Sequence, residues 1–152
     1  MTIKKAALED IPLLIKINRE CDDAVEKILN FTDEYLEKEF KNLMKNYYFE
    51  FFIYDDKGFI AFNPKFSGYK NCEVYWLVVS KRFQGKGVGT KLMEFIEKYA
   101  KRKKFCGIYL YTHPIRKNTL HFYKKLGYKK INEFPNYYSN SDASFLFGKR
   151  LK

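Results

Sequence analysis

The chain has 152 residues, of which 46% are hydrophobic and 19% aromatic, enough to build one domain over residues 1–152. Its formal net charge is +11, which suits a protein that binds nucleic acid, a protein that binds an anionic small molecule, or a protein that is simply soluble and rich in lysine. The basic residues are dispersed, however, and no helix-turn-helix or zinc motif accompanies them, so nucleic acid is the disfavoured partner. The three cysteines are scattered and have no CxxC pair or histidine cluster, which argues against a metal site or a disulfide framework.

The first half of the chain is predicted to contain strands at both ends and two helices between them. Acids and an early proline favour the start of the first helix, and Thr32 is placed to cap the second. The predicted elements are a strand over Ile3–Ala7, a helix from Ile11, a helix over Asp33–Asn46, a strand over Tyr47–Tyr54, a turn over Asp55–Gly58 and a strand over Phe59–Phe62.

The second half alternates strands with helices. Its predicted elements are a loop over Asn63–Asn71, a strand over Glu73–Val79, a helix over Gly87–Lys103, a strand over Cys106–Thr112, a helix over Asn118–Leu126 that Gly127 stops, and strands over Tyr128–Ile131 and Ala143–Phe147. This order predicts a mixed, largely antiparallel sheet with helices on its faces. The unit from Glu73 to Thr112 is expected to be a right-handed parallel crossover.

The segment Gln84–Gly89 joins the strongest predicted strand to a helix. Its glycines allow the backbone to approach a ligand closely, and a helix start offers unpaired N–H groups together with the positive end of the helix dipole. Such a turn is an anion site that suits phosphate. The spacing matches neither the Gly-x-Gly-x-x-Gly dinucleotide fingerprint nor a P-loop.

Two segments of the chain resemble the GNAT superfamily of N-acetyltransferases. Gln84-x-x-Gly87-x-Gly89, within the stretch Glu73–Met93, is similar to the strand, pyrophosphate loop and helix of that family. Downstream, Phe122–Tyr128 resembles the family segment F-Y-x-x-x-G-F/Y. The resemblance covers nearly the whole chain and implies an α/β (α+β) fold with about six to seven strands flanked by about four helices.

The resemblance also implies acetyl-CoA as co-substrate, with no metal. The residues expected to bind it are Leu77, Val78 and Val79 along the pantetheine arm, and Gln84, Gly85, Lys86, Gly87, Val88, Gly89 and Thr90 around the pyrophosphate. A backbone N–H near Val78 is expected to face the thioester oxygen. Family members often carry an asparagine seven positions before the motif tyrosine, where this chain has Arg116. Either Asn118 contacts the cofactor in its place, or Arg116 reaches a phosphate.

Glu73 and Tyr123 are the expected catalytic residues. By the same resemblance, Glu73 would draw the proton from the amine through water, and Tyr123 would protonate the departing thiolate. Counting along an extended strand places Glu73 on one face with Tyr75, Leu77 and Val79. The alternatives are that Glu73 is a strand-start acid paired with a lysine, and that Tyr123 is a core aromatic.

The acceptor is expected to be a primary amine on a peptide or a small molecule. In this fold its pocket is built by the first two helices and the loop Phe134–Asp142. Glu20, Asp22, Asp23 and Glu26 form an acidic cluster that would attract a cationic amine, or are exposed acids at a helix end. The alternative function is a non-enzymatic acyl-CoA-binding or sensing domain.

No apolar leader segment and no run of membrane-spanning length occur in the sequence, so we expect a cytoplasmic protein without a membrane partner. The sequence leaves the formation of a homodimer open.

Overall fold

The structure is a computed structural model that describes residues 2–23, 27, 29–135 and 143–152. Within these residues, seven strands form one sheet in the order β1-β2-β3-β4-β5-β7-β6. Every neighbouring pair is antiparallel except β4 and β5, which are parallel. The prediction of a mixed, largely antiparallel sheet is therefore confirmed, as is the parallel relation of the two strands that flank α4.

Most bounds of the described elements follow the predictions, but β6 runs on to Pro135, so Phe134 and Pro135 lie in a strand and not in the predicted acceptor loop. The strands are β1 Ile3–Lys5, β2 Glu50–Tyr54, β3 Gly58–Asn63, β4 Asn71–Val79, β5 Gly107–Thr112, β6 Lys129–Pro135 and β7 Ala143–Arg150. The α-helices are α1 Ile11–Glu20, α3 Asp33–Lys45, α4 Val88–Arg102 and α5 Lys117–Lys125, and the short 3-10 helices are η1 Leu8–Asp10 and η2 Lys81–Phe83. None of the described helices has both the length and the apolar character needed to cross a membrane.

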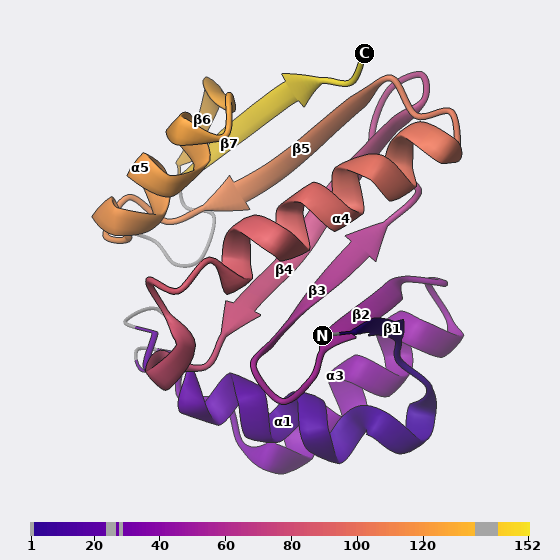
Figure 1. The fold of residues 1–152 in the computed structure, drawn as a ribbon, viewed down its shortest axis with the longest axis vertical. Helices are drawn as coiled ribbons and strands as arrows, with labels where there is room; N and C mark the ends of the chain where they lie inside the picture. The colour runs from indigo at the N-terminus through magenta and orange to yellow at the C-terminus, as the bar shows by residue number, and fades with distance from the viewer. Residues whose placement is uncertain (1, 24–26, 28, 136–142) are drawn as a thin grey trace.

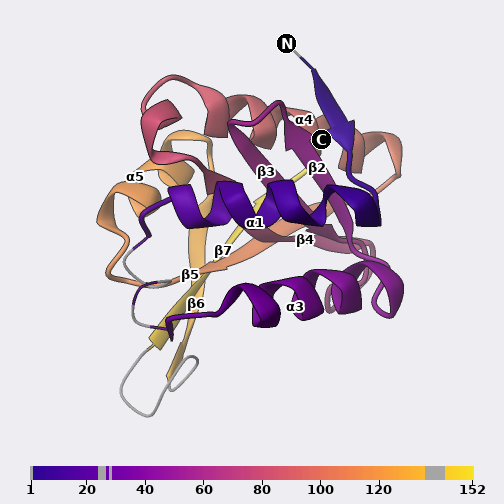
Figure 2. The same cartoon turned by 90° about the horizontal axis from the view of Figure 1, so that it is seen from below.

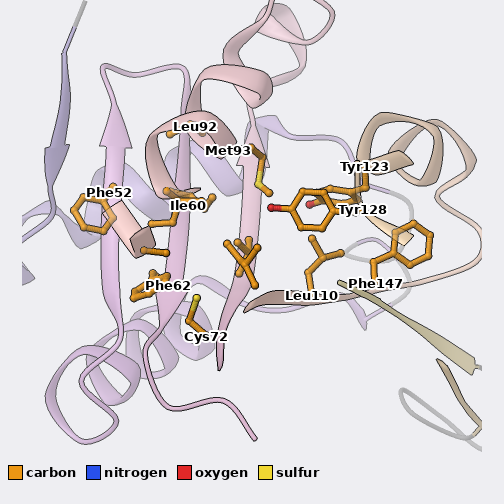
Figure 3. Close-up of a cluster of buried hydrophobic side chains, with 14 of the residues drawn as sticks. Phe52, Ile60, Phe62, Cys72, Leu92, Met93, Leu110, Tyr123, Tyr128 and Phe147 are labelled. Carbon is orange, nitrogen blue, oxygen red and sulfur yellow. The ribbon is translucent and has the colours of Figure 1, made fainter. Parts of the chain in front are cut away.

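Helices cover both faces of the central strands, and α3 and α4 lie on opposite sides of the sheet (Figure 2). One core cluster joins α4 to the sheet, and its members include Ile60, Leu92 and Met93 (Figure 3). The other joins α1 and α3 to the opposite face through residues such as Phe40 and Phe59. Because both faces are covered, β2 and β3 are hydrophobic at nearly every position instead of alternating.

Local signals account for the helix ends. The Oγ1 atom of Thr32 accepts a hydrogen bond of 3.1 Å from the N–H of Tyr35, as a helix cap should. At the end of α5, Gly127 has φ +92°, and the N–H of Tyr128 bonds the carbonyl of Tyr123 at 3.0 Å. Both predictions, the Thr32 cap and the Gly127 stop, are confirmed.

The aromatic run before β2 is partly mispredicted as strand. Tyr48 has φ +58°, and the N–H of Phe49 bonds back to the carbonyl of Leu43 in α3. The chain therefore reverses sharply after α3, and β2 begins at Glu50 instead of Tyr47. Aromatic residues favour strands, but this turn is fixed by the packing of α3.

The strands β4 and β5 pair only at their beginnings. Their register runs over Asn71–Gly107, Cys72–Ile108 and Glu73–Tyr109, and then the pairing ends. The two strands diverge beyond this point, toward the start of α4 and toward α5 (Figure 1). Within the described part of the chain, the edge of β4 that faces β5 after Glu73 consequently has no strand partner.

The double-sided core predicts a strong dependence on its buried rings. Phe62 is fully buried against the rings of Tyr99 and Phe105, so Phe62→Ala should lower the free energy of unfolding by roughly 3–5 kcal/mol. Tyr69, which is 80% exposed, provides the control, and Tyr69→Ala should change it by less than about 0.5 kcal/mol. Urea denaturation measures both, and equal effects would contradict this description of the core.

Candidate active site

A cavity of about 500 Å³ lies where β4 and β5 diverge. It extends from the turn before α4 to α5, and α1 contributes one wall. Its lining includes the sequence-predicted residues Leu77, Val78, Val79, Gln84, Gly85, Gly87, Gly89, Thr90, Asn118 and Tyr123. Segments that are far apart in the sequence therefore meet at one site.

The turn before α4 depends on glycine at two positions. Gly85 has φ +74° and Gly87 has φ +84°, in the left-handed region that other residues rarely adopt. A side chain added at either position would meet nothing within 4 Å, so the space above the turn is open. The first internal bond of α4 runs from the N–H of Lys91 to the carbonyl of Gly87 at 3.0 Å. The N–H groups of the three preceding residues therefore precede the hydrogen-bond ladder of the helix.

The side chain of Gln84 links the turn to two neighbouring segments of the chain. Its Nε2 atom donates to the carbonyl of Val79 at 2.9 Å and to the carbonyl of Cys21 at 3.0 Å. The side chain thus ties the end of β4 and the segment after α1 to the turn. Sequence reasoning assigned Gln84 to the cofactor, and the structure gives its amide nitrogen this anchoring contact as well.

Two of the predicted binding residues turn their side chains away from the cavity. The side chain of Val88 is buried in the core beneath α4, and the ammonium of Lys86 lies 6.0 Å from the centre of the Phe83 ring. Neither residue lines the cavity, so each could serve a ligand there only through its backbone. Gly89 has a packing reason to be glycine, since a Cβ there would lie 3.3 Å from the ring of Phe122 in α5.

Glu73 lies at the last pair of residues that joins β4 to β5, and it does not line the cavity. It is only 7% exposed, and its carboxylate accepts a hydrogen bond of 2.9 Å from the Nδ2 atom of Asn63. Burial raises the pKa of Glu73 above its ordinary value of 4.5, although the Asn63 bond acts in the opposite direction. The alternative that Glu73 pairs with a lysine is wrong, because the partner that the structure gives it is Asn63.

The predicted face of Glu73 is also wrong. The register between β3 and β4 shifts between Ala61 and Phe62, so that Tyr75 is the extra residue of a β-bulge. Before the bulge, Cys72 and Val74 face α4, and after it Leu77 and Val79 do. Glu73 therefore lies on the opposite face from Leu77 and Val79, together with Trp76 and Val78, because one inserted residue reverses the alternation.

Tyr123 of α5 lines the cavity, as Leu110 does, and both belong to the buried cluster drawn in Figure 3. It is 5% exposed, and its ring contacts those of Phe122, Tyr128 and Phe147. Burial raises the pKa of its phenol well above the ordinary value, while Arg116 lowers it slightly. The hydroxyl is therefore protonated at neutral pH and able to donate. Tyr123 is at once a core aromatic and a cavity residue.

Arg116 is engaged by a carboxylate. Its Nε and Nη2 atoms donate to the two carboxylate oxygens of Asp23 at 2.9 and 2.8 Å. This fork joins the segment after α1 to the start of α5, and Arg116 lines the cavity. Asn118 lines the cavity, and the N-cap of α5 is Arg116, so Asn118 is not the cap of this helix.

The acidic cluster has structural partners at each described position. The Oγ atom of Ser80 donates to Glu20 at 3.0 Å, and the ammonium of Lys81 lies 2.7 Å from Asp22. Hydrogen bonds from Lys27 and Lys81 lower the pKa of Asp22 to about 2. Glu26 and residues 136–142 of the predicted acceptor loop lie outside the described residues. The cluster therefore joins α1 to the turn before α4.

The structure adds cavity residues that the sequence did not single out. They are Asn18, Cys21, Trp76, Tyr111 and Thr112. Thr112 is 1% exposed, and within the described part of the chain its hydroxyl has no hydrogen-bond partner. A bound ligand could satisfy it. The sequence contained one signal for Thr112, because it ends a predicted strand, and ligands of α/β proteins bind beyond the carboxyl ends of the strands.

A comparison with models of protein families identifies the family of this chain. The model of the acetyltransferase (GNAT) family matches residues 14–128, most of the chain. The chain belongs to the GNAT family. Among the described residues, no group of three histidine, cysteine, aspartate or glutamate side chains could hold a metal ion.

Two curated relatives of this GNAT chain match its sequence over about half its length. A probable N-acetyltransferase 14 of Xenopus tropicalis is 36% identical over 80 residues, which is 51% of this chain and 38% of the relative. Streptothricin acetyltransferase A of Bacillus subtilis is 37% identical over 68 residues, which is 45% of this chain and 38% of the relative. The matched segment thus spans well under half the length of each relative.

A solved structure shows that the resemblance extends through the whole fold. An aminoglycoside 6'-N-acetyltransferase complexed with coenzyme A superposes with a TM-score of 0.80 at 21% identity, covering 100% of this chain and 98% of that one. The predicted GNAT-like fold is confirmed.

The left-handed turn yields a stability prediction. Gly87→Ala should lower the free energy of unfolding by about 1–2 kcal/mol, because a Cβ strains a backbone at φ +84°. Gly87→Asn is the matched control, since asparagine tolerates this conformation better, and it should lose less. Urea denaturation compares the three proteins, and an Ala variant as stable as the wild type would contradict the assigned geometry.

Proposed function

We propose that the chain is an N-acetyltransferase that transfers the acetyl group of acetyl-CoA directly to a primary amine. The observation that carries this proposal is the meeting of three features at one cavity. These are the open glycine turn at the start of α4, the unpaired edge of β4, and the buried hydroxyl of Tyr123. The relative that shares this fold was solved with coenzyme A bound.

The turn before α4 fits a pyrophosphate. Gly85 and Gly87 leave open space where side chains would stand, and the N–H groups of Val88, Gly89 and Thr90 lie at the positive end of the helix. The ring of Phe83 lines the cavity beside the turn, and the cations of Arg82 and Lys86 lie over that ring, outside the lining. Two negatively charged phosphates would find backbone donors and positive charge in the same place.

The edge of β4 fits an extended, amide-bearing arm. Leu77, Val78 and Val79 line the cavity, and β5 does not pair with them. An arm with amide groups could bond to this edge as an added strand does. A backbone N–H near Val78 would then face the thioester oxygen, where it would stabilise the negative charge of the tetrahedral intermediate.

Glu73 is the proposed general base. Its burial raises the pKa of the carboxylate toward neutrality, which strengthens it as a base. Because Glu73 lies just behind the cavity lining, a water molecule would carry the proton from the ammonium of the acceptor to the Glu73 carboxylate. The neutral amine then forms a C–N bond to the acetyl carbon.

Tyr123 is the proposed general acid. When the intermediate collapses, the C–S bond breaks and the electron pair leaves on sulfur. The phenol of Tyr123, which burial keeps protonated, donates its proton to that sulfur. The amide nitrogen loses its extra proton, and water passes that proton to the Tyr123 phenolate, so the products are the neutral amide and the free thiol of CoA.

Binding of acetyl-CoA should respond to charge at the glycine turn. Gly85→Asp, which places a carboxylate in the open space above the turn, should weaken binding at least about ten-fold, because like charges repel. Gly85→Asn has the same shape without the charge and is the matched control. Calorimetric titration with CoA measures both variants, and equal affinities would place the pyrophosphate elsewhere.

Removing the acid should slow turnover while leaving the fold intact. Tyr123→Phe should lower kcat by about 10²-fold or more, the usual size of general acid catalysis. Tyr128→Phe is the matched control, because Tyr128 is equally buried but donates to Glu97, outside the cavity. The release of CoA thiol measures the rate. An unchanged kcat for Tyr123→Phe would remove Tyr123 from the mechanism.

The pH dependence should identify the base. A base must be ionised to act, so kcat should rise with pH through a pKa that lies above the ordinary 4.5 of a glutamate. Glu73→Gln should abolish this limb and lower kcat about 10²-fold. Glu97→Gln removes a part-buried carboxylate that bonds Tyr128 and Lys149, and this variant should keep the limb. A Glu73→Gln variant with an unchanged pH profile would contradict its role as the base.

CoA binding without turnover of any amine would support a sensing domain instead of an acetyltransferase.

A further inference from the structure

The part of the cavity beyond the glycine turn is walled by aromatic rings. Tyr75 and Trp76 line it from β4, and Tyr111 lines it from β5. Tyr75 occupies the bulge, where the inserted residue re-aims the strand, and it is 43% exposed. A molecule that enters here therefore meets flat apolar surfaces on two sides.

The rings are held in position from behind. The ring of Phe49 lies 5.0 Å from that of Tyr75, and the ring of Phe40 lies 5.2 Å from that of Trp76. On the other side, Phe66 and Phe134 lie 6.1 and 5.7 Å from Tyr111. Rings supported in this way lose little conformational freedom on binding, which favours affinity for a flat partner.

The charges around these rings disfavour more than one positive group. Among the described residues that line the cavity, the one carboxylate is that of Asp23, and Arg116 occupies both of its oxygens. Arg116 and Lys125 add positive charge to the lining. Glu73 lies behind the wall, where its negative charge contributes to raising the pKa of Tyr111, after the larger effect of burial.

We propose that the acceptor is a small primary monoamine carried on a flat, apolar group, as in an arylalkylamine. This inference rests on the proposed acetyl transfer. The single ammonium would lie over the faces of Tyr75 and Tyr111, where the ring quadrupoles attract a cation, and within reach of the field of Glu73. A polyamine or an aminoglycoside would bring further ammonium groups to a lining whose described residues offer no second carboxylate, on a chain whose formal net charge is +11.

The test compares phenethylamine with spermidine and kanamycin as acceptors, measured by CoA release from acetyl-CoA. We expect kcat/KM for phenethylamine to exceed that for either polycation at least about ten-fold, in line with one or two cation–π contacts. Higher activity on spermidine or kanamycin would overturn the inference while leaving the acetyltransferase proposal intact.

Two variants test the walls themselves. Tyr75→Ala and Tyr111→Ala should each raise KM for phenethylamine about three- to ten-fold and leave KM for acetyl-CoA unchanged. Tyr69→Ala, on the exposed loop before β4, should change neither. Unchanged KM for phenethylamine in both wall variants would overturn the inference.

If no amine releases CoA, the proposed acetyl transfer fails, and calorimetric titration of the CoA-bound protein with phenethylamine decides the inference separately. Binding that Tyr75→Ala abolishes would support an arylalkylamine site. No binding would overturn it.

Discussion

The site depends on one structural constraint, the short pairing of the parallel strands β4 and β5. Three residue pairs hold their beginnings together, and then the strands diverge. A sheet that stayed closed would bury Val78 and Val79 between strands and leave no cavity. The bulge at Tyr75, two residues after the last residue of β4 that pairs with β5, adds to this effect because it turns the following side chains over and increases local twist. The open edge that results is an unusual feature in the middle of a sheet, since unpaired backbone groups there require partners.

A second set of contacts holds the opening in shape. The segment from Glu20 to Asp23 reaches Ser80, Lys81 and Gln84 on one side and Arg116 on the other. Exposed pairs such as Asp22–Lys81 contribute little individually. The fork between Arg116 and Asp23 is less exposed and bidentate, a geometry that fixes orientation as well as distance. The acids after α1 therefore connect the turn before α4, the end of α1 and the start of α5 into one frame around the cavity.

Burial gives the two proposed catalytic groups their character. It raises the pKa of the Glu73 carboxylate, which would make it a stronger base, and it raises the pKa of the Tyr123 phenol, which keeps it protonated. Burial shifts the pKa of both groups, although they lie on opposite faces of the sheet, Glu73 on β4 and Tyr123 on α5. That separation suits two roles performed at different stages of one reaction, deprotonation before attack and protonation after it.

The sequence by itself determined the features that depend on neighbouring residues. The cap at Thr32, the stop at Gly127 and the turn Gln84–Gly89 follow from local backbone chemistry, because a positive φ or a helix end needs particular residues at particular positions. Hydrophobic patterns likewise predicted most strands and helices, and so the sheet class. The tertiary structure decided the rest. It placed Glu73 on the opposite face from Leu77, because a bulge in β4 is set by pairing with β3, and it gave Arg116 to Asp23, 93 positions away. Partners at such separation leave no periodic signal along the chain, since only the packed sheet brings them together.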